Sequence, residues 1–192
     1  KIAAFASWDV FPYIINDKRS GIPVNAGYMQ EFNIKTPIVD YINKNQIRTP
    51  VIWENVRLDV YTHNLALEYI KKKRPKLVYI AYGETDDFAH GGKYDFYINS
   101  LNYTDNMIAE LWGYVQSNKF YKDNTYFIIT TDHGRGLMED WSGHGTSQAS
   151  WLAILGPNIE KTGLVEGEFF TNQIAETIMQ ISKKSKTKIP TD

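Results

Sequence analysis

Lys76–Tyr82 has the sequence KLVYIAY, a short apolar run that ends at Gly83 and continues into the acidic segment GETDDFAH. A run of this length and composition is typical of a strand buried on both faces of a parallel sheet. Two similar runs follow, TYFIITT at Thr125–Thr131 and a shorter one at Trp151–Leu155. We predict that Lys76–Tyr82 and Thr125–Thr131 are neighbouring parallel strands of one sheet.

Segments with helical periodicity lie between and around these runs. Leu58–Lys73 ends before Pro75, and its predicted buried face consists of Val60, Leu65, Leu67 and Ile70. Tyr94–Ser117 has the most regular apolar stripe, made of Tyr97, Ile98, Leu101, Ile108, Leu111, Trp112 and Val115. Shorter helices are predicted at residues 36–45 and 171–182, with a buried strand at residues 1–7. Residues 8–27 show no clear period.

The alternation of strands and helices predicts an α/β fold with a mainly parallel central sheet flanked by helices. We expect one domain, residues 1–192. With 43% hydrophobic residues a folded core is expected, and a net charge of −1 argues against a nucleic-acid partner. No apolar run approaches the roughly 18 residues of a membrane-spanning helix. The absence of cysteine excludes disulfides and a cysteine nucleophile within this sequence.

The acidic segment after the first run contains a possible metal-binding pair. Asp86 and His90 are four residues apart, so on one helical turn they would share a face and could reach one cation. The alternative is that Asp86 caps a helix and His90 is a surface residue.

Two further histidines lie in glycine-rich segments nearby. Asp132 and His133 follow the second apolar run, where a turn into Gly134 could direct both toward one ion. His144 lies between Gly143 and Gly145. The alternatives are an Asp turn with a solvated His133, and a loop histidine at His144.

Together these segments offer five nitrogen or oxygen ligands: Asp86, His90, Asp132, His133 and His144. Imidazole and carboxylate ligands suit zinc, and additional carboxylate or water ligands would admit manganese.

Three motifs follow one another along the chain: Asp-x-x-x-His, then Asp-His-Gly after a strand, then a late His-Gly. This pattern resembles the alkaline phosphatase superfamily, which includes phosphatases, phosphodiesterases, sulfatases and phosphoglycerate mutases. The segment GETDDFAHGGKYDFYINSLNYTDNMI is similar to bacterial sulfatase-like members. The resemblance covers roughly residues 76–181. It implies two metal ions, one held by Asp86, His90 and His144 and the other by Asp132 and His133.

The superfamily also uses a further Asp from an early strand and a Thr or Ser nucleophile, and neither can be placed here. We therefore expect both upstream of Lys1, with the chain forming the C-terminal part of an alkaline phosphatase-like catalytic domain that is incomplete at its N-terminus. An exported or periplasmic location is expected, with the leader absent from this chain. The implied activity is hydrolysis of phosphate monoesters or diesters. The alternatives are a phosphomutase, a sulfatase, or a non-catalytic metal-binding domain.

Other charged residues allow more than one interpretation. Arg135 could bind the phosphate of a small phosphorylated or sulfated substrate, or be structural. Glu84 and Asp87 could orient the metal ligands or be solvated. His63 is expected to be exposed or packed on its helix.

Overall fold

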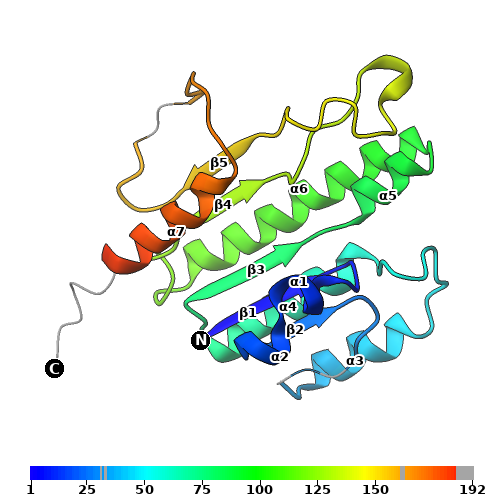
Figure 1. Ribbon diagram of the computed structural model, residues 1–192. Coiled ribbons are helices and arrows are strands. Elements are labelled where there is room, and N and C mark those ends of the chain that lie inside the picture. The colour runs from blue at the N-terminus through cyan, green and yellow to red at the C-terminus, as the bar shows by residue number, and fades with distance from the viewer. Residues whose placement is uncertain (31, 33, 161–162, 185–192) are drawn as a thin grey trace, which may run out of the picture.

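The computed structural model of the chain describes residues 1–30, 32, 34–160 and 163–184 (Figure 1). A parallel three-stranded sheet has the order β2-β1-β3, formed by Val24–Ala26, Ile2–Ala6 and Leu77–Ala81. Ala6 of β1 lies opposite Ala26 and Ala81, so the three strands end at one edge. The segment after β3 therefore emerges where open α/β sheets bind ligands. The predicted α/β class is confirmed.

Helices cover both faces of this sheet. On one face, Phe5 of β1 packs against Leu65 and Tyr69 of α4 (Asp59–Lys73), and α3 (Pro37–Gln46) completes the cluster. The other face consists of small side chains, against which α1 (Phe11–Ile15) packs. The short α2 (Asp17–Ser20) then leads toward β2. Among the helices of the described residues, none is both long and apolar enough to cross a bilayer.

The second half of the chain adds α5 (Glu84–His90), α6 (Tyr94–Ser117), β4 (Phe127–Thr130), β5 (Leu152–Leu155) and α7 (Asn172–Lys184). α6 runs along β3 and β4, and α7 lies beside β4 and β5 (Figure 1). Leu111 and Val115 of α6 form a second core with residues of α4, and Val78 of β3 and Phe127 of β4 both pack against it. This shared core joins the two halves of the molecule.

The prediction that Lys76–Tyr82 and Thr125–Thr131 are neighbouring parallel strands is wrong. β3 pairs with β1, whereas β4 pairs antiparallel with β5 in a separate two-stranded sheet. Val78 of β3 and Phe127 of β4 pack on the α4–α6 core. The expected burial of Lys76–Tyr82 on both faces is wrong, because Leu77 and Tyr79 on the other face of β3 are 39% and 51% exposed. Composition does not specify a hydrogen-bonding partner, however, and the segment between β4 and β5 returns the chain alongside β4.

The predicted helices are present, and their ends differ from the predicted ones by at most two residues. Some predicted burial is wrong. Val60 is 48% exposed because five residues of helix place it about 140° around the axis from Leu65. Ile98 and Leu101 are also exposed, since the core contacts of α6 are made by Leu111 and Val115 farther along the helix.

Candidate metal centre

α5 begins directly after β3 and presents Asp86 and His90 on one face. Asp86 Oδ2 lies 3.4 Å from His90 Nε2, an arrangement that follows from their spacing of one helical turn. Because β3 fixes the start of α5, both side chains are held at the carboxyl edge of the parallel sheet.

The segment between β4 and β5 supplies His133 and His144. It folds back on itself: Gly134 N donates to Ser147 O at 2.9 Å, and Thr146 Oγ1 donates to the carbonyl of Arg135. A β-carbon at Gly134 would collide with the backbone of Thr146. Glycine is therefore required at Gly134 for the two arms of the loop to approach and bring both histidines to one place.

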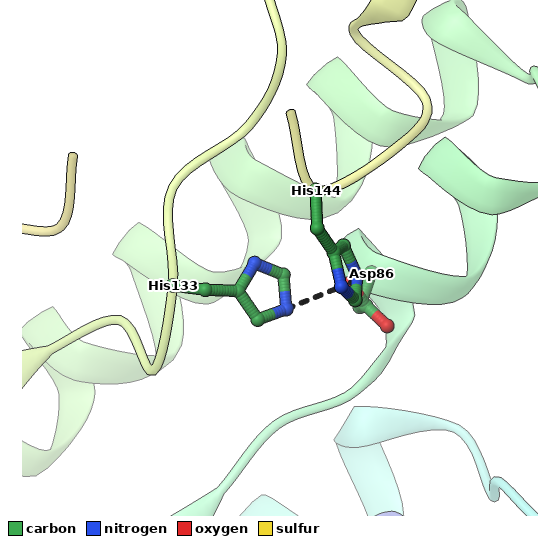
Figure 2. A group of neighbouring side chains, drawn as sticks. All are labelled: Asp86, His133 and His144. Atoms are coloured by element: carbon green, nitrogen blue, oxygen red, sulfur yellow. Dashed lines mark ion pairs between the residues drawn. The ribbon is translucent and has the colours of Figure 1, made fainter. Parts of the chain in front are cut away.

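Asp86 from α5 converges with His133 and His144 from the two arms of the β4–β5 loop (Figure 2), and their ligand atoms lie within 4.8 Å of one another. Asp86 Oδ1 is 3.5 Å from His133 Nε2 and 3.8 Å from His144 Nε2. His90 joins them, with its Nε2 atom 3.0 Å from that of His144. We call these four residues the His–Asp cluster.

Asp86, His90 and His144, which the resemblance assigns to one ion, lie together in the cluster. Asp132, which the resemblance assigns to one ion with His133, has its Oδ2 3.8 Å from His133 Nε2, and its side chain is 91% exposed. His133 also faces Asp86 and stacks near His144, with ring centroids 3.9 Å apart. The structure brings four of the five predicted ligands together and leaves Asp132 at the rim. Their metal-binding roles remain predictions.

Arg135 lies inside this arrangement. Its Nη2 atom pairs with Asp86 Oδ1, and Nη1 donates to Ser142 O at 3.3 Å. The guanidinium therefore neutralises the Asp86 carboxylate and connects α5 to the loop that carries His144. The role of Arg135 in phosphate binding remains a prediction.

The acidic side chain of Asp87, next to Asp86, favours a cation at the cluster. Burial raises the pKa of Asp87, and the neighbouring Asp86 charge raises it further, against the opposing effects of His90 and Arg135. Closely spaced carboxylates that resist ionisation are stabilised when a positive ion is placed near them.

The donor set fits a divalent metal ion. Two nitrogen ligands at about 2.0–2.1 Å from a tetrahedral zinc lie about 3.3 Å apart. The corresponding separations within the cluster, 3.0 to 3.8 Å, are close to that value. Small side-chain movements would therefore let Asp86, His90 and His144 surround a cation, with His133 beside them and Arg135 released from Asp86.

Two buried polar residues of α4, His63 and Asp59, were given no role by sequence reasoning. His63, expected to be exposed or packed, is only 1% exposed and bonds to Tyr82 and Glu110. The burial of His63 could have been predicted from its helical spacing, because it lies four and seven residues before Leu67 and Ile70. Asp59, at 2% exposed, was not identified at all.

Comparison with known proteins places these observations in a family. A comparison with curated proteins gives no match. Residues 25–185 match the sequence profile of the Metalloenzyme superfamily, and this range includes all five predicted ligands. Since the profile covers most of the chain, the protein belongs to the Metalloenzyme superfamily, a part of the alkaline phosphatase-like superfamily.

Proposed function

We propose that the chain forms the metal-binding part of an enzyme that hydrolyses phosphate monoesters or diesters with two divalent ions, zinc or manganese. The convergence of Asp86, His133 and His144 within 4.8 Å carries this proposal. Membership of the Metalloenzyme superfamily supports a metal-dependent enzyme, and the resemblance of the motifs to phosphatases and phosphodiesterases suggests the ester class.

Each residue has a distinct role in this proposal. Asp86, His90 and His144 hold one cation, and His133 with Asp132 holds the second, after Asp132 turns inward from the rim. Bound cations supply Lewis-acid stabilisation of a phosphate group. Arg135 moves from Asp86 to the substrate, where its planar guanidinium binds two phosphate oxygens.

The nucleophile is assigned to a hydroxyl outside this chain. Asp132 and His133 offer only two ligands to the second cation, so a further ligand is also required. We therefore expect the 192-residue chain alone to bind metal and to hydrolyse esters poorly. Related alternatives are phosphomutase and sulfatase activity. In a non-catalytic metal-binding domain, by contrast, metal would bind and no ester would be cleaved in any form of the protein.

Metal binding is the decisive first test. Titration of the metal-free chain with cobalt(II) and zinc should show binding that His144→Ala weakens by at least about 100-fold, because a direct ligand is lost. Asp105→Asn, which removes an exposed carboxylate from α6, is the matched control and should bind cobalt like wild type. Equal affinities in the wild type and His144→Ala would exclude the cluster as the site.

Hydrolysis then separates the ester classes. 4-Nitrophenyl phosphate, bis(4-nitrophenyl) phosphate and 4-nitrophenyl sulfate should be compared after chelation and readdition of zinc or manganese. We expect a form of the protein that includes the proposed nucleophile to cleave a phosphate probe, and its His144→Ala variant to lose most turnover. Preferential cleavage of the sulfate would favour a sulfatase, and no cleavage by any form would favour the non-catalytic alternative.

A further inference from the structure

A group of fully buried polar side chains lies where β1, α4 and the start of α5 meet. Ser7, Arg57, Asp59 and Thr62 are each at most 2% exposed. Thr62 Oγ1 accepts a hydrogen bond from Arg57 Nε at 2.8 Å and lies 2.8 Å from Ser7 Oγ. Apolar residues of similar volume are often at least as stabilising as buried ionic groups. The network therefore requires an explanation beyond packing.

Asp59 caps the N-terminus of α5 from another helix. Its Oδ1 accepts from Gly83 N at 2.8 Å and from Ser7 Oγ at 2.5 Å, and its Oδ2 accepts from Glu84 N at 3.1 Å. The first N–H groups of a helix have no partner within it. Gly83, at the N-cap position, has no side chain with which to cap α5, so Asp59 supplies this function.

Glu84 caps α4 in return. Its Oε1 accepts from Asp59 N at 2.6 Å, at the first residue of α4, where the N-cap residue Leu58 has no side-chain oxygen. Each of the two helices thus receives its cap from the first residue of the other. A carboxylate at each N-terminus also interacts favourably with the helix dipole. We call this pair of contacts the reciprocal cap.

The reciprocal cap acts on the element that carries Asp86 and His90. α5 has only seven residues, too few to be stable as an isolated helix. Its apolar side is held by Phe88, whose ring lies between those of Trp53 and Phe96 at centroid distances of 4.7 and 5.2 Å. The reciprocal cap fixes the direction in which the first turn of α5 leaves β3.

We propose that Asp59 and Glu84 are positioning residues that, through the reciprocal cap, hold Asp86 and His90 in place to bind a metal ion with His144. This proposal rests on the proposed function of the His–Asp cluster. Asp59 thus contributes to metal affinity, although Asp59 lies in a different helix from Asp86 and His90 and is not itself a ligand.

The network offers variants that separate positioning from stability. Asp59→Asn preserves size but cannot accept hydrogen bonds from both Gly83 N and Glu84 N. Thr62→Val is the matched control, because it removes a buried hydroxyl from the same network at a residue whose contacts are with Ser7 and Arg57. Glu84→Gln retains an acceptor for Asp59 N, whereas Glu84→Ala does not.

Cobalt(II) titrations of the four variants, with their melting temperatures, test the proposal. Asp59→Asn and Glu84→Ala should weaken the cobalt Kd by about 10- to 100-fold, the typical effect of losing a residue that orients a metal ligand. Thr62→Val should lower the melting temperature while its Kd stays within about twofold of wild type, and Glu84→Gln should restore most of the affinity lost in Glu84→Ala. Hydrogen exchange of the metal-free proteins should become faster at Gly83 and Glu84 in Asp59→Asn but not in Thr62→Val.

Two results would overturn the proposal: wild-type cobalt affinity in both Asp59→Asn and Glu84→Ala, or an equal loss of affinity in Thr62→Val. If Asp59→Asn does not fold, the two Glu84 variants still decide the outcome. Failure of the wild-type chain to bind cobalt would instead contradict the proposed function, and the exchange rates at Gly83 and Glu84 would then show whether the cap orders α5.

Discussion

His63 is a buried imidazole with both ring nitrogens in contact with other elements. Nδ1 lies 2.9 Å from Tyr82 Oη at the end of β3, and Nε2 lies 3.0 Å from Glu110 Oε2 on α6. The side chain thus connects α4 to β3 and α6 through two hydrogen bonds. Burial lowers the pKa of His63, although the Glu110 carboxylate partly opposes this effect, and Lys71 lowers it further.

This lowered pKa predicts acid sensitivity. The unfolded chain, with a histidine pKa near 6.5, binds the proton more readily than the folded protein. The contribution of His63 to stability is therefore fully present above about pH 6.5 and is lost as the pH falls through the folded pKa. Urea unfolding between pH 7 and 5 should show a steeper loss of stability in the wild type than in His63→Gln, by at most about 1.4 kcal/mol per pH unit. Identical slopes would contradict this role.

The predictability of individual residues depends on how local their geometry is. Asp86 and His90 could be paired from sequence because helical spacing alone brings them to one face. Asp132 and His133 could not be oriented in the same way, since a strand end followed by glycines allows several directions. Asp59 left no local signal, because its partners Gly83 and Glu84 are more than 20 residues away and depend on the packing of α4 against β3.

α4 is the helix that both cores share. Leu65 packs in the cluster beneath β1, and Leu67 packs in the cluster shared with α6. Its buried positions therefore stabilise the sheet and the second half of the chain together.

Side-chain truncation on the buried face of α4 should reduce the free energy of unfolding much more than truncation on its exposed face. Leu65→Ala, at a residue 1% exposed, should lower the free energy of unfolding by about 2–5 kcal/mol through lost contacts and a residual cavity. Val60→Ala, at a residue 48% exposed on the same helix, should change it by less than about 0.5 kcal/mol. Chemical denaturation measures both, and similar losses in the two variants would contradict the observed packing.

The positions of the helices and strands could be predicted more accurately than the pairing of the strands. The ends of α6 matched the prediction because a long amphipathic period is a strong local signal. The small strand β2 and the helices α1 and α2, within residues 8–27, were missed because they are too short to show a period. The partner of β4 was predicted wrongly because pairing depends on the path of the 131–151 segment and not on the strand itself.

At the scale of the whole molecule, the His–Asp cluster joins the two sheets. Asp86 and His90 follow β3 of the first sheet, whereas His133 and His144 lie between the strands of the second. A metal ion bound at the cluster would therefore add to the Asp86–Arg135 ion pair and the α4–α6 core, which already connect these parts of the molecule.

Metal binding should accordingly stabilise the folded chain as a unit. A ligand that binds only the folded state adds about 2.7 kcal/mol at a free concentration 100 times its Kd. Zinc at that concentration should raise the melting temperature of the wild type, and a chelator should reverse the shift. His144→Ala should show little zinc-dependent change. A shift of wild-type size in this variant would indicate that zinc stabilises the protein at another site.

The separation of the two sheets also affects how strongly the cluster can discriminate between ions of different radius. In a continuous sheet, backbone hydrogen bonds would fix the spacing between the segments that carry the ligands. Here β3 and β4 lie in different sheets and both pack on the α4–α6 core, and packed elements can slide slightly past one another. A metal site between such elements would change its radius to match the bound ion at a low cost in free energy. Selection by ionic size, by contrast, requires a rigid cavity. The identity of the bound metal would then be decided by cellular supply and by ligand chemistry more than by fit.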